Sequence, residues 1–329
     1  MLSRVADSIY WLHRYIERAE NTARCIDVNL NLMLDLPDGP TEQWAPLVDT
    51  TGDTALFHAR YGVTTREHVV AFLTFDAQNP NSIMSCLSTA RENARAARDI
   101  LSSEMWEQVN TFYLMVREEH SKQRVQEEPH AFFTDVKMAS HLFVGLTEGT
   151  MSHNEGWHFG RLGRLLERAD QTSRLLDVKY FLLLPYAADV GTPIDDLQWT
   201  AVLKSASAFE MYRKRFGRIV PERIADFLVL DREFPRAMHH CLIKAEESLH
   251  TISGTPLGTF QNLAEQRLGR LRSEMDYMQI AEIMAAGLHE FLDGLQIKLN
   301  DVGAAISATF FGALCQQDLR MWTESVTTQ

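Results

Sequence analysis

Two segments of this chain carry glutamate and arginine side chains at the three- and four-residue spacing of a helix face. Residues 11–28 read WLHRYIERAENTARCIDV, and residues 161–178 read RLGRLLERADQTSRLLDV. The segments align without a gap at an offset of 150 residues, and nine of the 18 aligned positions are identical. Self-similarity over such a long period predicts a structural duplication within the chain.

The residue types in both segments suit anion binding and proton transfer. An arginine guanidinium group binds a carboxylate or phosphate through two parallel hydrogen bonds, and lysine does not replace it in that geometry. Glu17 and Glu167 occupy equivalent positions and are the candidate catalytic residues, because burial can raise a carboxyl pKa into the range of a general acid or base. The candidate ligand-binding residues of the repeat are Arg14, Arg18, Arg24, Arg164, Arg168 and Arg174.

Two other interpretations of these charges stay open. Charges at this spacing commonly form a solvated helix face, although such a face would tolerate lysine for arginine, and three arginines recur unchanged here. A buried ion-pair network between the two copies is the second alternative, with Glu17 reaching Arg168 and Glu167 reaching Arg18. Networks of this kind fix the register of helices more than they add stability.

The elements that would position these residues are helices. Apolar residues recur at three- and four-residue spacing between short clusters of proline and glycine, and strand-like alternation is scarce. We allow short extended structure only in Phe57–Phe75. The fold class is therefore all-α, a multi-helix bundle forming one domain over 1–329, with two related halves at about 1–150 and 151–329. The expected helices are Ala6–Leu36, Arg66–Ala77, Ile83–Leu101, Glu104–Glu119, Phe132–Met151, Glu155–Leu184, Trp199–Phe216, Ile219–Leu228, Pro235–Ser253, Phe260–Met275 and Ile280–Phe311, the last broken near Gly294.

A second arginine-rich segment lies between the two copies of the repeat. Arg91, Arg95 and Arg98 share one face of the expected helix Ile83–Leu101, and we include Arg91 and Arg95 among the candidate ligand-binding residues. Three arginines on one side of a helix suit a carboxylate or phosphate ligand. A solvated face is the alternative for this segment.

Metal and nucleophilic chemistry have weaker sequence signals. Ferritin-like di-iron sites use Glu-x-x-His pairs, and this chain contains two of them at Glu155/His158 and Glu247/His250. That short pattern arises easily by chance, so we predict no metal ligand and no cofactor. The chain has no Gly-x-Ser-x-Gly elbow, which argues against nucleophilic catalysis by a serine. It has no P-loop, which argues against ATP binding by this chain alone.

The composition limits the possible partners and the compartment. The formal net charge of −12 argues against binding to nucleic acid or an anionic membrane by bulk electrostatics. The four cysteines are Cys25, Cys86, Cys241 and Cys315, and none has the spacing of a zinc-ligand pair. Sparse cysteine use, together with an N-terminus that lacks the apolar core of a signal peptide, predicts a cytoplasmic protein.

At the repeated segments the sequence resembles the alpha-E family, a bacterial all-helical family named for its Glu-Arg motif. The resemblance covers nearly the whole chain. It departs at His13, where the family pattern has glycine and the second copy has Gly163. The segments that carry the resemblance are LSRVADSIYWLHRYIERAENTAR, RENARAARDILSSEMWEQVN, EGWHFGRLGRLLERADQTSRLLDVKY, WTAVLKSASAFEMYRKRF and FLVLDREFPRAMHHCL.

The resemblance implies partners rather than a reaction. Members of the family are typically encoded beside, or fused to, an ATP-grasp-like protein and a transglutaminase-like protein. The implied role is that of a component of a peptide or amide synthesis or modification system. Its small ligand would be an anion or a peptide, held in a pocket lined by the two Glu-Arg helices. The alternatives are a non-catalytic scaffold that uses the motif as an ion-pair lock, and a carboxylate-bridged metalloenzyme.

Overall fold

The computed structural model describes residues 1–35, 44–182 and 192–312. Every regular element in these ranges is helical, so the all-α prediction is confirmed. None of the helices in these ranges combines the length and apolar composition needed to cross a bilayer.

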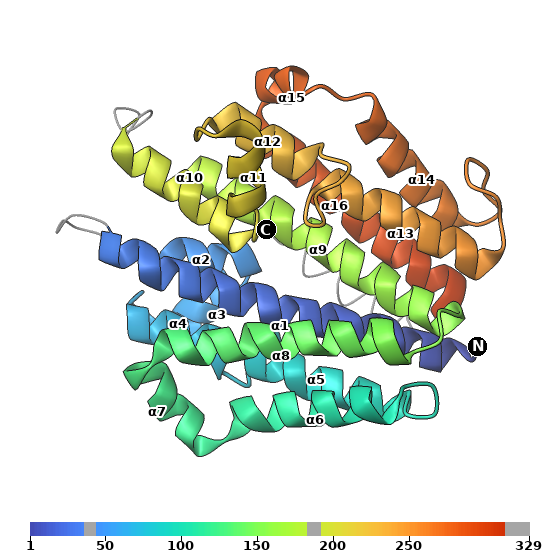
Figure 1. Cartoon of the computed structure of the whole chain (residues 1–329), viewed down its shortest axis with the longest axis horizontal. Helices are drawn as coiled ribbons and strands as arrows, with labels where there is room; N and C mark the ends of the chain where they lie inside the picture. The colour runs from blue at the N-terminus through green and yellow to red at the C-terminus, as the bar shows by residue number, and fades with distance from the viewer. Residues whose placement is uncertain (36–43, 183–191, 313–329) are drawn as a thin grey trace.

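The two copies of the Glu-Arg segment lie on the two central helices, α1 (Ser3–Asp35) and α9 (Glu155–Leu182), which pack against each other in the middle of the molecule (Figure 1). The apolar stripe of α1, which includes Leu12, Ile16 and Ala19, is buried. Its opposite side is also covered, because Glu17 and Glu20 are buried as well. A solvated charged face is therefore the wrong interpretation of the repeat.

Each central helix belongs to a ring of four packed helices. In the first group α1 packs against α5 and α8, and α6 joins these two; in the second group α9 packs against α13 and α16, and α14 joins them. Figure 1 shows the first group below the central seam and the second above it. The bounds of the other six helices are Ile83–Ala96 (α5), Ser103–Arg117 (α6), Pro129–Thr150 (α8), Met238–Ser253 (α13), Leu263–Asp276 (α14) and Leu288–Ile306 (α16).

Short helices connect the two groups across the seam. The helix α2 follows α1 in the chain but packs on α9, whereas α10 follows α9 and packs mainly on α1. The order of helices is thus the same in both groups, which is the arrangement that a duplicated unit would give; the duplication itself stays a prediction. The remaining helices are Ala45–Thr51 (α2), Thr54–Tyr61 (α3), Arg66–Thr74 (α4), Glu119–Glu127 (α7), Pro193–Ser205 (α10), Phe209–Phe216 (α11), Pro221–Val229 (α12) and Ile280–Ala286 (α15).

Three of the expected elements are wrong in detail. The expected helix Trp199–Phe216 is interrupted at Ser207, whose φ of 52° ends α10 and starts the turn into α11. The last helix breaks at Gly287, where φ is 105°, and not at Gly294. The segment Phe57–Phe75 is helical rather than extended, because Gly62 and the Thr65 N-cap divide it into α3 and α4.

The central helices approach each other closely at two glycines of α9. A Cβ atom on Gly163 would lie 2.4 Å from the backbone oxygen of Tyr10, and one on Gly160 would lie 2.5 Å from the imidazole ring of His13. The glycine that the family pattern has in the first copy is therefore not needed there. His13 fills the space that Gly160 leaves open, so the crossing is tight although the two copies differ.

Candidate functional site

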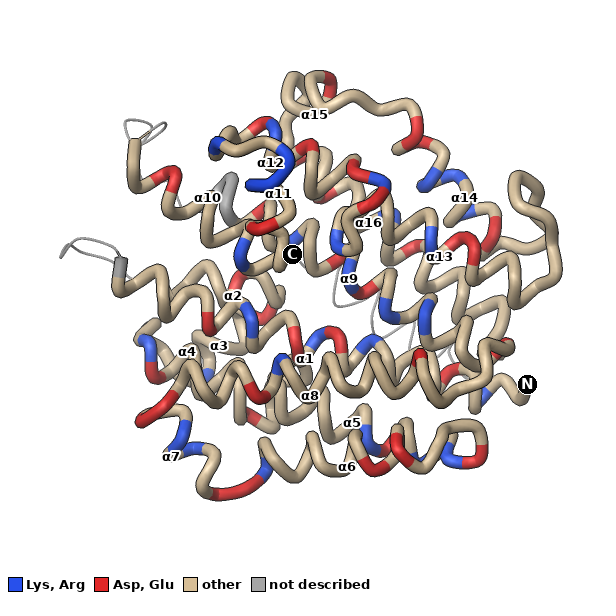
Figure 2. The backbone as a smooth tube through the Cα atoms, viewed as in Figure 1, with Lys and Arg blue, Asp and Glu red and all other residues tan. Residues whose placement is uncertain are grey.

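The two glutamates of the motif form reciprocal ion pairs between α1 and α9. The guanidinium group of Arg168 donates to both carboxylate oxygens of Glu17 at 2.7 and 2.9 Å. The guanidinium group of Arg18 donates to both carboxylate oxygens of Glu167 at 2.6 and 2.9 Å. These are the two pairs that the sequence predicts for a network between the copies. Figure 2 shows acidic and basic residues gathered on both helices along the seam.

A further arginine completes the surroundings of each glutamate. Arg236, from the turn before α13, donates to Glu17 at 3.0 Å and to Asn21 at 2.8 Å. Arg14 donates to Glu167 at 2.8 Å, and its guanidinium lies 4.8 Å from the ring centroid of Trp11. Each carboxylate therefore accepts from two arginines, which is what a buried negative charge requires.

These partners set the protonation state of both glutamates. Burial by itself would raise the pKa of Glu17, but Arg168 and Arg236 outweigh burial and hold that pKa well below its ordinary range. Burial opposes Arg18 and Arg14 in the same way at Glu167, whose pKa falls to about 2. Both groups are thus carboxylates at neutral pH. A general acid or base needs the opposite shift, so this geometry does not favour proton transfer by either group.

The outer acidic residues of the motif pair within their own helices and with histidines of the flanking helices. Glu20 accepts from Arg24 and also from Arg236 at 2.8 Å. At the equivalent position of α9, Asp170 accepts from Arg174 at 2.9 Å. The next acidic residues of the repeat, Asp27 and Asp177, each pair with a histidine. His130 lies 2.7 Å from Asp27, and His289 lies 2.6 Å from Asp177.

Arg164, the remaining predicted arginine of the repeat, makes fewer hydrogen bonds than its counterpart Arg14 does. Arg164 donates through Nη2 to Glu148 of α8 at 3.1 Å, while its buried Nε and Nη1 atoms have no hydrogen-bond partner among the described residues. Its counterpart Arg14 is bound through Nε to Glu167 and through Nη1 to the hydroxyl of Tyr10 at 3.3 Å. The two copies of the motif are therefore equivalent in position but not in hydrogen bonding.

The structure does not bring the second arginine segment to the motif. Arg91 donates to Asn110 of α6 at 2.8 Å and stacks on Tyr113. Arg95 is an exposed side chain whose ion pair is with Glu92 on its own helix. Arg91 thus lies at the contact of α5 with α6 and Arg95 at the surface, and neither is paired with a glutamate of the seam.

The residues behind the metal and nucleophile alternatives are also separated from one another. Within the described ranges no three His, Cys, Asp or Glu side chains are grouped closely enough to hold a metal ion. Glu155 pairs with the N-terminal amine, and His250 bonds to the carbonyl of Thr255. Burial raises the pKa of Cys86 and of Cys241 to about 12, which keeps both as thiols; Cys315 lies outside the described residues.

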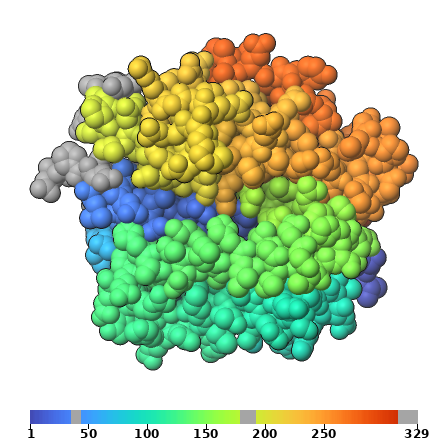
Figure 3. Space-filling model, in the orientation of Figure 1, coloured from blue at the N-terminus to red at the C-terminus, as the bar shows by residue number. Residues whose placement is uncertain are grey.

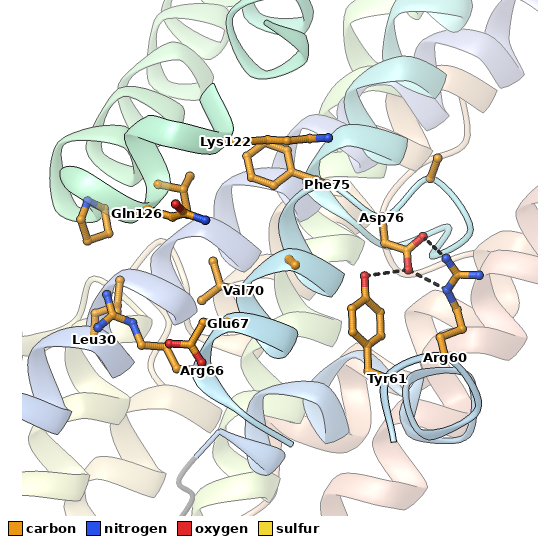
Figure 4. Close-up of a pocket in the computed structure, with 14 residues that line it drawn as sticks. Leu30, Arg60, Tyr61, Arg66, Glu67, Val70, Phe75, Asp76, Lys122 and Gln126 are labelled. Atoms are coloured by element: carbon orange, nitrogen blue, oxygen red, sulfur yellow. Dashed lines mark hydrogen bonds and ion pairs between the residues drawn. The ribbon is translucent and has the colours of Figure 1, made fainter. Parts of the chain in front are cut away.

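Two adjoining cavities lie in the first group of helices, away from the paired glutamates. The first has a volume of about 550 Å³ between α1, α4 and α7, and Figure 4 shows Arg60 and Tyr61 both bonded to Asp76 in its wall. The second, of about 610 Å³, is lined by Tyr15 near the motif. No glutamate or arginine of the repeat lines either cavity.

The sequence interpretation missed Arg236, which contacts more of the motif than several predicted residues. It also missed Asn81, which accepts from Arg18 at 2.8 Å in the equivalent place of the first group. A second repeat marks both residues. Pro80 and Cys86 are spaced as Pro235 and Cys241 are, and each Cys Sγ faces the carbonyl of its proline, at 3.8 and 3.4 Å. Alignment of these Pro-x5-Cys segments places Asn81 opposite Arg236.

Comparison with known proteins gives relatives but no solved counterpart. Uncharacterised proteins of Mycobacterium bovis and of two Mycobacterium tuberculosis strains are 23% identical over 330 residues. The matched region covers 93% of this chain but only 36% of those relatives. No solved structure gives a significant match.

A family model matches residues 1–311, and its description is "a predicted alpha-helical domain with a conserved ER motif". The match spans nearly all of the residues described above, including both Glu-Arg segments. The chain therefore belongs to the Alpha-E family.

Proposed function

We propose that this chain is a non-catalytic, partner-binding component of a peptide or amide synthesis or modification system, and that the Glu-Arg motif is its structural lock. The supporting observation is the pair of reciprocal bidentate contacts, Glu17 with Arg168 and Glu167 with Arg18. In such a lock each carboxylate is held by two arginines of the opposite helix group, so neither group can shift along the other without breaking buried charge contacts.

The burial of the charges supports a lock over a catalytic pocket. The Glu167 side chain is fully buried and that of Glu17 is 3% exposed, so a substrate has no route to either carboxylate without displacing an arginine. Both carboxylates are ionised and doubly paired. The metalloenzyme alternative receives no support from the described side chains.

The proposed partner is an ATP-grasp-like protein, with a transglutaminase-like protein as a second member of the system. This part rests on the family and on the length of the relatives. The mycobacterial proteins continue well beyond the matched region, so in them the domain is joined to other sequence. A helical domain without a phosphate-binding loop fits a system in which another polypeptide activates the substrate.

The experiment mixes the chain with the ATP-grasp-like protein, ATP and amino acids, and measures product formed per mole of folded chain. A lock predicts that Glu17→Gln lowers the fraction of the chain that is folded but leaves the product per mole of folded chain unchanged. The control is Glu92→Gln, which removes an exposed carboxylate on α5 and leaves both stability and product unchanged. A folded Glu17→Gln variant without product would instead show that this carboxylate takes part in the reaction.

A further inference from the structure

The seam between α1 and α9 has two equivalent faces, one around Glu17 and one around Glu167. The faces differ in the type of buried hydrogen-bonding atom that has no partner among the described residues. On the face of Glu17, the buried atoms without a partner among the described residues are N–H donors: Nε of Arg24, Nε and Nη1 of Arg164 and Nδ2 of Asn21. On the face of Glu167 the corresponding orphan is an acceptor, Oδ1 of Asp170. Unsatisfied buried donors are costly, and an anion is the ligand that satisfies them.

The equivalent arginines Arg24 and Arg174 show the same contrast in their electrostatics. Asp170 raises the pKa of Arg174 above its ordinary value. Burial and the adjacent Arg236 lower the pKa of Arg24 to about 10, although Arg24 also pairs with Glu20. Besides burial, a difference in sequence contributes, since Arg236 stands where the first group has the neutral Asn81.

A histidine side chain reaches this region from α8. His141 is exposed at the surface, and burial followed by Arg24 and Arg236 lowers its pKa. Its imidazole is therefore close to both guanidinium groups while still open to solvent. Figure 3 shows part of α1, in blue, recessed between α8, in green, and the yellow segment around α11 and α12.

We propose that Arg24, Arg236 and His141 form a binding site for a small oxyanion, a carboxylate or a phosphate. Arg236 is the buried element of the site, with 8% of its side chain exposed, and it is fixed by Glu17, Glu20 and Asn21. Arg24 supplies the free Nε donor, and His141 supplies an exposed imidazole near both guanidinium groups. The site goes beyond the proposed function, because a lock between helices requires no ligand.

The test compares variants that are expected to fold. Arg24→Met leaves Glu20 paired with Arg236 at 2.8 Å, and His141→Ala changes a surface residue. The matched control is Arg174→Met, which removes the equivalent arginine on the face without free donors. The midpoint of thermal unfolding of each full-length chain is followed during titration with sodium phosphate, sodium acetate or sodium chloride at equal ionic strength.

We expect phosphate or acetate to raise the Tm of the wild-type chain saturably, as a ligand specific for the folded state does. Phosphate also stabilises proteins without binding, but that effect does not saturate and does not depend on one arginine. Arg24→Met and His141→Ala should weaken the apparent Kd at least tenfold and about threefold respectively, whereas Arg174→Met stays within twofold of wild type. The ligand is a phosphate if the rise in Tm saturates with sodium phosphate, and a carboxylate if it saturates with sodium acetate.

Two results would overturn the site. One is a Tm that follows ionic strength alike in all three salts. The other is an equal loss of anion binding in Arg24→Met and Arg174→Met. Neither result bears on the lock, whose ion pairs are tested without any added anion.

Discussion

At the scale of single residues, the repeat identified the charged partners because it preserved residue type as well as polarity. Arginine at three equivalent positions and glutamate at Glu17 and Glu167 indicated bidentate geometry rather than a solvated face. The direction of the pKa shift of the two glutamates was not predictable from the residue types alone. Burial raises a carboxyl pKa and paired arginines lower it. At Glu17 and Glu167 the arginines outweigh burial, because Arg236 and Arg14 add to the effect of the reciprocal partners Arg168 and Arg18.

The buried histidine at the crossing gives a prediction for stability against pH. Burial lowers the pKa of His13 to about 4, against an ordinary value near 6.5. The unfolded chain therefore binds this proton at a higher pH than the folded chain does. The contribution to stability is complete above pH 6.5 and is lost as pH falls from 6.5 towards 4, by on the order of 3 kcal/mol.

The measurement is urea unfolding of wild type and His13→Asn at pH 7, 6 and 5. Replacement of the histidine alters packing at every pH, so the comparison is between slopes rather than absolute values. The His13→Asn chain is expected to lose less free energy of unfolding between pH 7 and 5 than wild type does. Parallel curves for the two chains would mean that His13 is not the group that titrates.

At the scale of helices, hydrophobic periodicity located the long elements within a few residues but not their breaks. The helices α1, α8 and α9 follow their expected ranges closely, because a long stripe of apolar residues has only one way to be buried. The breaks at Ser207 and Gly287 depend on single residues with positive φ, which tertiary packing selects. The short α2 and α7 have too few turns for a periodic signal.

A single methyl group added at the crossing of α1 and α9 is expected to destabilise the folded chain strongly. Gly163→Ala would place Cβ 2.4 Å from the backbone oxygen of Tyr10, which cannot move aside as a side chain does, so a destabilisation of about 3 kcal/mol is expected. Gly145→Ala on α8 is the matched control. It meets nothing within 4 Å and should stabilise its helix by up to about 1 kcal/mol. Thermal unfolding of both variants measures the difference.

The companion glycine separates side-chain crowding from backbone crowding. Gly160→Ala meets the ring of His13 at 2.5 Å, so truncation of that ring in the double variant His13→Ala/Gly160→Ala relieves part of the strain. Strict additivity of the two single changes would contradict the packing of His13 against Gly160.

At the scale of the whole molecule, the sequence predicted two related halves from one helix, and the structure shows two four-helix groups with the same order of elements. The offset between the groups grows from 150 residues at the motif to 155 at the Pro-x5-Cys segments, and this change hid the second repeat from a search at one fixed offset. The contact between the groups was not predictable either, since periodicity reports which face of a helix is buried and not what covers it.

The lock between the groups is tested most directly by a double-mutant cycle on Glu17→Gln and Arg168→Met, measured as free energies of unfolding in urea. Each single change leaves a buried charge short of a partner and is expected to cost about 3 kcal/mol or more. The predicted result is a coupling of about 1 kcal/mol or more between the two changes, so that the double variant is less destabilised than their sum. Two single variants with nearly wild-type stability and no coupling would contradict the lock.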